Sequence, residues 1–425
     1  MGYPVALDKS EHLSKTRTFR TNHLMNKPDR RTPCSLLLLT LMLLAACSPT
    51  TRLIGDPESP YPVSNPAVGD MVHLPTGHKI SFEQLIDAIA GSRIIYVGET
   101  HDNPASHQWQ LDILSGLHRK NPQKMALAME MFNPEQQQVL DSWVAGELSE
   151  EDFLRQVDWF TNWRMNFALY RPLLDYCREN RIPIVALNAP KSLVHQVGRT
   201  PFEDLPEEVR SQLPEFDFND PYQRAMTEGI YSGHSMGKAM SDGFLRVQTL
   251  WDETMAQNLA NYLQSPQGEG RQAVVVAGGN HVRYGFGIPR RVHRRLPLSY
   301  QLVGSREIEI VEKREHQTMD VDLPHFPMAP WDYLKLTRYE TLEKGVKLGA
   351  IIDETPQGIE LKQIMPGSAA EKAGLLAGDI LTRAAGNPLT ESFDLLYPLM
   401  NLTSGEELDL EVLRAEERLE VRVEF

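Results

Sequence analysis

Four short apolar runs predict the strands of a buried parallel sheet. They occupy residues 93–97 (RIIYV), 125–129 (MALAM), 182–187 (IPIVAL) and 273–277 (AVVVA). Strands that are covered on both faces are apolar throughout rather than alternating, as these runs are. Helical periodicity lies between them, over 108–117, 134–144 and 250–263. Residues 71–340 are therefore predicted to form an α/β domain, a mostly parallel sheet with flanking helices.

One long segment, residues 201–242, interrupts this alternation. It is polar and punctuated by glycine and proline, which predicts a helical insertion. Whether the insertion closes over a site is left open by the sequence.

Polar side chains follow each of the four predicted strands. The first strand is followed by Glu99 and His101, the second by Glu130, the third by Asn188, and the fourth by the sequence GGNH ending at His281. The carboxyl ends of parallel strands meet at one edge of a sheet, where ligands bind in open α/β folds. A GxxH spacing occurs twice, at 98–101 and 278–281. Two histidines and two carboxylates at one edge predict either metal binding or acid–base chemistry.

Each of these residues also has a purely structural interpretation. Glu99 could cap the helix that follows it, and His101 could be a hydrogen-bonded core histidine. Asn188 is typical of a turn. Glu130 fits such an interpretation least, because an unpaired carboxylate at the end of a buried strand is costly.

The composition narrows the class of protein. The chain has 425 residues and a formal net charge of −14, which disfavours a nucleic-acid-binding protein because such proteins usually carry a basic field. Three cysteines are too few for a disulfide framework or a four-cysteine zinc site. The apolar fraction of 41% is enough for a packed core, which excludes a wholly disordered chain.

The N-terminal segment is predicted to be a signal peptide rather than part of the fold. Residues 34–46 are almost entirely apolar, too short to span a bilayer, and preceded by Lys27, Arg30 and Arg31. The run ends in Leu-Ala-Ala before Cys47, which resembles a bacterial lipobox. We predict that translation starts at Met25, because residues 1–24 fit no part of a signal peptide. An ordinary signal peptide that happens to contain a cysteine is the alternative.

A lipobox implies that residues 1–47 contain the signal peptide and that Cys47 becomes the lipidated first residue. Acyl chains would then hold the protein on a membrane surface of the bacterial cell envelope without a spanning helix. Ser48 follows Cys47, and by resemblance this favours the outer membrane. Residues 48–70 are rich in proline, serine and glycine, which predicts a flexible tether.

Several motifs of the predicted α/β domain together resemble the ChaN-like haem-binding lipoprotein family, which belongs to a wider group with the TraB and Tiki proteins. They are GETHDNPASHQ (98–108), ALAMEMF (126–132), QQVLDSWVAG (137–146), VALNAP (185–190), WDETMA (251–256) and GGNHVRYGFGIP (278–289). The resemblance implies a lipid-anchored protein that binds haem for iron uptake. Its Tiki branch implies instead a metal-dependent hydrolase or protease. Whether the chain is an enzyme therefore stays open, with a binding protein favoured.

The resemblance also implies which residues form the site. Glu99, His101, Glu130 and His281 are the shared set, catalytic if the protein is a hydrolase, and His101, Glu130 and His281 would then ligate a divalent metal. For haem, Asn188 and Asn280 join this set. The axial ligand of the iron stays open among histidine and tyrosine candidates, as does a homodimer that sandwiches haem. The candidates are Tyr170, Tyr284, Tyr231, His234 and Met236.

A set of aromatic residues near Tyr170 has two interpretations. At helical spacing it could line a face of haem, or it could be ordinary core packing. The set is Trp159, Phe160, Trp163, Phe167 and Tyr170.

The C-terminal residues 341–425 resemble a bacterial PDZ domain, which implies a small β-rich fold with two helices, through the sequences KLGAI (347–351) and MPGSAAEKAGLLAGDILTRAAGNPL (365–389). PDZ domains bind extended peptides by strand addition. The resemblance places the peptide-binding loop at Leu348, Gly349, Ala350 and Ile351. The loop has one glycine where the usual pattern has two, so capture of a terminal carboxylate stays open. The alternative is a module with a packing role only.

Overall fold

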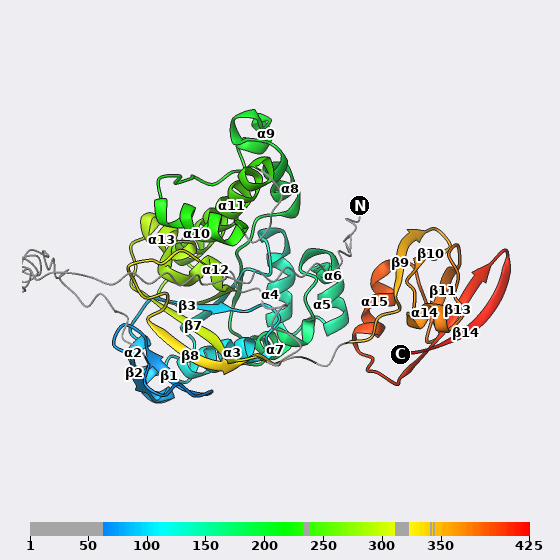
Figure 1. Cartoon of the computed structure of the whole chain (residues 1–425), viewed down its shortest axis with the longest axis horizontal. Helices are drawn as coiled ribbons and strands as arrows, with labels where there is room; N and C mark the ends of the chain where they lie inside the picture. Colours follow the sequence, from blue (N-terminus) through cyan, green and yellow to red (C-terminus); the bar gives the residue numbers. More distant parts are fainter. Residues whose placement is uncertain (1–62, 233–237, 311–322, 341, 343–344) are drawn as a thin grey trace, which may run out of the picture. The chain divides into compact units, whose positions relative to one another are not determined.

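The computed structural model describes residues 63–232, 238–310, 323–340, 342 and 345–425. They form an α/β domain and a smaller β-rich domain, which are described separately (Figure 1). Cys47 and the rest of the predicted signal peptide lie outside the described residues, as do most of the predicted tether, His234 and Met236.

All four predicted strands are present, side by side and parallel. They are β3 (Ile94–Glu99), β6 (Gln272–Gly278), β4 (Met125–Met129) and β5 (Ile184–Ala186), in that spatial order. Two further parallel strands, β7 (Tyr300–Glu309) and β8 (Tyr333–Arg338), extend the sheet beyond β3. The short strands β1 (Met71–His73) and β2 (His78–Ile80) complete this edge in antiparallel pairing. The predicted fold class, a mostly parallel sheet with flanking helices, is confirmed.

Helices cover both faces of the sheet, so the domain has three layers (Figure 1). Ile95 and Val97 of β3 pack with α2 (Phe82–Ile89) and α3 (Pro104–Lys120) on one face. On the other face, Ile94 and Tyr96 belong to a second core with α11 (Lys238–Gln264) and α13 (Ile288–Arg295). Burial on both faces explains why these strands are apolar at every position.

Helices occupy each of the three intervals that the periodicity predicted: α3, η1 (Pro134–Gln136) with α4 (Gln137–Ala145), and α11. Further helices that were not predicted are α5 (Glu150–Gln156), α6 (Trp159–Asn162), η2 (Phe167–Leu169), α7 (Arg171–Asn180) and α8 (Lys191–Arg199). Asn103 accepts a hydrogen bond from the Ala105 amide and caps α3, whose first residue is Pro104.

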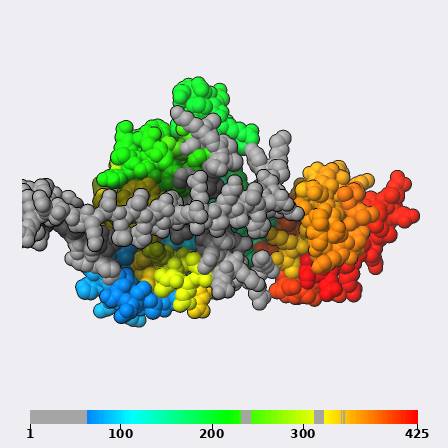
Figure 2. Space-filling view, viewed as in Figure 1, coloured from blue at the N-terminus to red at the C-terminus, as the bar shows by residue number. Residues whose placement is uncertain are grey.

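The predicted insertion is helical in its described part. It contains η3 (Phe202–Asp204), α9 (Glu207–Arg210) and α10 (Pro221–Ser232), whose residues lie at the surface in green in Figure 2. Its predicted end at 242 is wrong, because α11 begins at Lys238. Gly243 of this helix lies against α8, where a Cβ atom would be only 2.6 Å from the Gly198 carbonyl oxygen. The lack of a side chain at Gly243 therefore permits close packing of the two helices.

The C-terminal domain is an antiparallel sheet with two helices, as predicted. Its strands are β9 (Ala350–Thr355), β10 (Gly358–Ile364), β11 (Ile380–Ala384), β12 (Asn387–Pro388), β13 (Glu407–Arg414) and β14 (Glu417–Glu424). The spatial order is β14-β13-β11-β10-β9, with β12 paired to β11. The helices are α14 (Ala369–Lys372) and α15 (Ser392–Met400). Buried Asp379 receives two hydrogen bonds from Arg414, each 2.7 Å, and so ties the start of β11 to the end of β13.

Among the described helices, none has both the length and the apolar character that crossing a bilayer requires.

Candidate functional site

Three adjacent strands bring the predicted site residues to one edge of the sheet. Glu99 ends β3, Glu130 directly follows β4, and His281 lies on α12 (Gly279–Val282), which directly follows β6. Since β6 lies between β3 and β4, these residues come from neighbouring positions along the carboxyl edge. In the register of the sheet, Glu99 pairs with Gly278. The sheet therefore gathers segments that are far apart in the sequence.

Glu99 and His101 form a carboxylate–histidine pair in which the carboxylate is buried and the imidazole is partly exposed. His101 Nδ1 lies 2.6 Å from Glu99 Oε1, and the Glu99 side chain is fully buried. Gln110 Nε2 donates to Glu99 Oε2 at 2.6 Å, and the Tyr170 hydroxyl donates to Oε1 at 3.0 Å. Because both Glu99 oxygens are hydrogen-bonded, the carboxylate is held in place and fixes the plane of the His101 ring.

The electrostatics of this pair favour its ionised form. Burial raises the pKa of Glu99, but the neighbouring His107 and His101 and the hydrogen bond from Gln110 outweigh it and lower the pKa to about 2. Burial lowers the pKa of His101, but the hydrogen bond and charge of Glu99 together with the charge of Glu130 raise it to about 9.

This pair predicts a stability plateau in mildly acidic solution. The folded pKa of His101 lies above its ordinary value of 6.5, so its contribution is fully present below pH 6.5 and is lost as the pH rises through about 9. The folded pKa of Glu99 lies below 4.5, so its contribution is present above pH 4.5 and is lost as the pH falls towards 2. The midpoint of urea unfolding should therefore be highest between pH 4.5 and 6.5, and it should decrease both below and above that window. A midpoint that stays constant or rises between pH 6.5 and 9 would contradict the assignment.

Asp252 and His281 form a second pair of the same kind. His281 Nδ1 lies 2.6 Å from Asp252 Oδ1 and 3.1 Å from Gln248 Nε2, and both partners lie on α11. Asp252 is fully buried, and its other oxygen accepts a hydrogen bond of 2.8 Å from Gln223. Burial lowers the pKa of His281, but the charges of Glu130 and Asp252 outweigh it, so that the pKa is raised.

Glu130 lies between the two histidines. Its Oε1 is 3.5 Å from His281 Nε2, and its Oε2 accepts a 2.6 Å hydrogen bond from the Gly278 amide. A Cβ atom at Gly278 would lie 2.8 Å from His101 Nε2 and 3.5 Å from Glu130 Oε2, so both groups flank this glycine. Each histidine thus uses Nδ1 for a carboxylate and keeps Nε2 on the side of Glu130.

This arrangement suits acid–base chemistry or ligation by the two Nε2 atoms, since a histidine ligand commonly donates its other ring nitrogen to a carboxylate. Across the described residues, no three His, Cys, Asp or Glu side chains are arranged so that they could hold a metal ion. Ligation of a divalent metal by His101, Glu130 and His281 therefore stays a prediction.

The other predicted site residues do not all lie beside Glu130 and the two histidines. Asn188 adjoins the site, because its Nδ2 donates to the Glu130 carbonyl at 2.9 Å. The side chain of Asn280 accepts a hydrogen bond from Arg283. Tyr284 lies in a separate aromatic cluster with Phe286 and Phe326, and Tyr231 contacts Phe244.

Tyr170 is close to the site but belongs to its support. It is fully buried, its hydroxyl is bound to Glu99, and burial raises its pKa well above 10. Trp159 and Phe167 are likewise buried in the core, which agrees with the interpretation of these aromatic residues as core packing. Trp163 differs from them, because it contacts the His101 ring edge-on at 5.3 Å and lines a cavity.

Four site residues were not recognised from the sequence: His107, Gln110, Gln248 and Asp252. Asp252 shares a helix face with the buried Met255, Ala256 and Leu259, so a carboxylate on an apolar stripe was the available signal. His107 and Gln110 likewise lie on the buried face of α3. Each polar residue on a buried helix face is costly unless it has a partner, and here the partner is a site residue.

A cavity of about 590 Å³ opens beside this cluster. Trp163 on its wall contacts the His101 ring, and Trp251 contacts the His281 ring at 6.1 Å between centroids. A volume of this size is typical of small-molecule sites.

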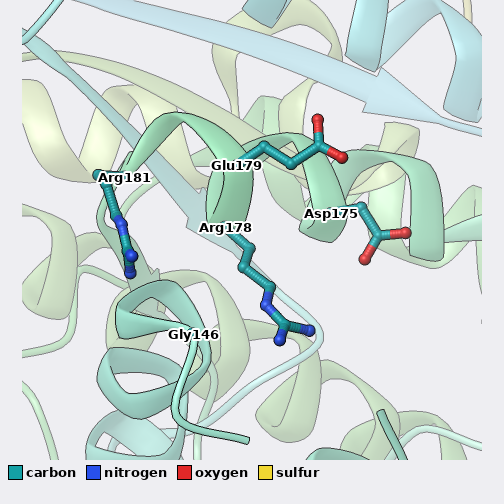
Figure 3. A pocket seen from close by; sticks show the side chains of 5 residues that line it. All are labelled: Gly146, Asp175, Arg178, Glu179 and Arg181. Carbon is teal, nitrogen blue, oxygen red and sulfur yellow. The ribbon is translucent and has the colours of Figure 1, made fainter. Parts of the chain in front are cut away.

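A second hollow, of about 530 Å³, has charged walls and a structural role. Figure 3 shows Arg178 and Arg181 of its lining on either side of the turn at Gly146. Arg181 donates to the Val144 carbonyl at 2.6 Å, and the Arg178 guanidinium lies 4.5 Å from the centre of the Trp143 ring. Both cations are thus engaged in holding the end of α4 against α7.

In the C-terminal domain, the predicted peptide-binding loop precedes and begins an edge strand. Leu348 is buried in the core of this domain, and its carbonyl accepts a hydrogen bond from Ala370. Gly349 has a φ of 78°, a conformation that favours glycine. Ala350 and Ile351 begin β9, at the end of the strand order, and Ile351 is 46% exposed.

Comparisons with known proteins identify both domains. Residues 85–292 match the family model described as haem-binding uptake, Tiki superfamily, ChaN, and residues 344–425 match the PDZ domain. The α/β match contains Glu99, His101, Glu130, Asp252 and His281. Haem is thus the ligand of the family that this part of the chain matches.

Individual relatives are more distant. The chain is 26% identical over 262 residues to the RETICULATA-RELATED 5 protein of Arabidopsis thaliana, covering 56% of this chain and 33% of that protein. It is 28% identical over 154 residues to the periplasmic pH-dependent serine endoprotease DegQ of Escherichia coli, and this match covers 36% of this chain and 28% of DegQ. The chain therefore spans about a third of the length of these curated relatives.

Among solved structures, the cofacial haem complex of ChaN from Campylobacter jejuni is similar, with a TM-score of 0.49 and 16% identity. The match covers 64% of this chain and 98% of the ChaN chain. The resemblance seen in the sequence is confirmed by the family models: the chain carries a ChaN-like domain of the Tiki superfamily followed by a C-terminal PDZ domain.

Proposed function

We propose that the protein is a lipid-anchored envelope protein that binds haem for iron uptake and docks a protein partner through its PDZ domain. The observation that carries the haem part is the position of the two histidine pairs beside an apolar-walled cavity within a family described as haem-binding. Haem would supply the iron, and this chain would supply a shaped pocket and a histidine or tyrosine donor. The outer membrane is the proposed location, because the residues up to Cys47 resemble a lipobox and Ser48 follows it.

Titration of the full-length protein in detergent with haemin tests this proposal. A saturable Soret band shifted from that of free haemin is the expected result, because protein ligation changes the surroundings of the iron. A spectrum that remains the sum of free haemin and protein would contradict haem binding. A Cys47→Ala variant should lose acyl labelling in the bacterial envelope and keep the Soret shift.

Peptide docking is proposed for the edge strand β9. It is the terminal strand of its sheet, and an extended peptide can pair with such an edge. Exposed Ile351 offers an apolar contact there. An Ile351→Asp variant should bind an extended peptide with an apolar C-terminal residue more weakly than the native chain does, as measured by fluorescence anisotropy. A Leu376→Asp variant is the matched control, because Leu376 is 53% exposed and lies outside β9.

A metal-dependent hydrolase is the second candidate, favoured by the two histidine Nε2 atoms on the side of Glu130. His101, Glu130 and His281 would hold a divalent metal, which would supply Lewis acidity towards a peptide carbonyl or a water. Glu130→Gln should then abolish metal-stimulated peptide cleavage, while the circular-dichroism spectrum stays that of the native fold because the amide occupies the same space. Absence of cleavage with Zn²⁺, Mn²⁺ and Co²⁺ would argue against this candidate.

A further inference from the structure

The cavity beside the histidine pairs is formed by segments that follow β4 and β5. Met131, Trp163, Asn188, Lys191, His195 and Trp251 are among its lining residues. Trp163 contacts His101, Trp251 contacts His281, and Asn188 donates to the Glu130 carbonyl. The cavity walls therefore contact the rings of both site histidines and the backbone of Glu130, and they include two indole rings.

One wall of the cavity is the first turn of α8. Lys191 and His195 are four residues apart, so they project from the same face of this helix. His195 is exposed and makes no hydrogen bond, ion pair or ring contact with any residue that the structure describes. Its imidazole is thus free to bind a ligand in the cavity.

Lys191 brings positive charge to the same wall. It donates to the Thr161 carbonyl, which leaves two of its ammonium protons for other partners. Burial and the positive charge of Arg164 lower the pKa of Lys191, while the charge of Asp158 raises it. The two remaining ammonium protons suit a carboxylate of a ligand in the cavity.

We propose that haem binds in this cavity, with His195 as a ligand of the iron and with Lys191 pairing with a propionate. This inference rests on the proposed haem binding and adds where the haem lies. The two indole rings and the Met131 side chain would contact the apolar ring system, while exposed Lys191 stays at the solvent side. The ligand class is thus a flat, apolar dicarboxylate that carries a metal.

Haemin titration of single variants of the full-length protein tests the assignment. His195→Ala should weaken haemin binding by at least about tenfold and shift the Soret maximum, because an iron ligand is lost. Lys191→Glu should weaken binding while leaving the Soret maximum in place, since it changes the propionate contact alone. His78→Ala is the matched control, an exposed histidine on β2 that should change neither quantity.

A variant that fills the cavity makes the test independent of the iron ligand. Ser192 is exposed and lines the cavity, so Ser192→Trp should fold and exclude haemin. Native affinity and spectrum in both His195→Ala and Ser192→Trp would overturn the location but leave the proposed function standing. No haemin binding by the native protein would overturn the proposed function itself.

Discussion

Replacing Glu99 with alanine is expected to lower the free energy of unfolding of the α/β domain by about 3–5 kcal/mol, the usual cost of removing one partner from a buried ion pair. The Glu99 side chain is fully buried, and both of its oxygens are hydrogen-bonded. Its loss leaves the Tyr170 hydroxyl, the Gln110 amide and the His101 ring without their partner, and each unsatisfied buried group adds to the cost.

Tryptophan fluorescence isolates this effect. All six tryptophans of the chain lie between 109 and 331, so urea unfolding followed by fluorescence reports on the α/β domain without the PDZ domain. Glu309→Ala is the matched control, because Glu309 pairs with Arg338 at the surface and such pairs contribute under about 1 kcal/mol. Equal losses of stability in Glu99→Ala and the control would show that the buried pair does not stabilise the fold.

Gly278→Ala is expected to displace His101 and to impair whichever activity the site has. The new Cβ would lie 2.8 Å from His101 Nε2 and 2.9 Å from Cε1. The ring cannot easily move away, because Glu99 holds its other nitrogen at 2.6 Å. Overpacking of this kind typically costs about 1–3 kcal/mol. We therefore expect a lower unfolding midpoint and a changed chemical shift of the His101 ring.

The adjacent glycine provides the control for this variant. A Cβ at Gly279 would lie 3.5 Å from the Glu99 carbonyl oxygen, an ordinary contact, and neither glycine has a positive φ. Gly279→Ala should therefore retain both stability and the His101 signal. If Gly278→Ala behaved like Gly279→Ala in stability and in the His101 signal, His101 would not lie where the structure places it.

The strands that position the site could be predicted because they are buried on both faces. β3, β4, β5 and β6 are continuous apolar runs, and their carboxyl ends necessarily share an edge. The strands β1 and β2 gave no such signal, because each has three residues, most of them partly exposed. The second half of β7, residues 305–309, contains partly exposed and exposed residues, because β3 pairs only with the first half of this strand.

The candidate site was predictable only where its residues follow a strand. Glu99, His101, Glu130 and His281 lie at or just after strand ends, and the sheet topology brings them together. Asp252 and Gln248 come from α11, whose rotation about its own axis is set by packing against the sheet rather than by any local pattern. The same holds for the cavity, since its walls come from α6, α8 and α11 and the segments after β4 and β5.

The pairing of β3 with β6 has a consequence for the maturation of the protein. Glu99 and Gly278 are paired in the sheet but lie far apart in the sequence. The two histidine pairs therefore cannot face each other until these distant segments have met. Contacts between distant segments form slowly, because a long loop must close first. A chain that is still being synthesised would therefore have no competent site, and ligand binding would begin only once the domain is complete.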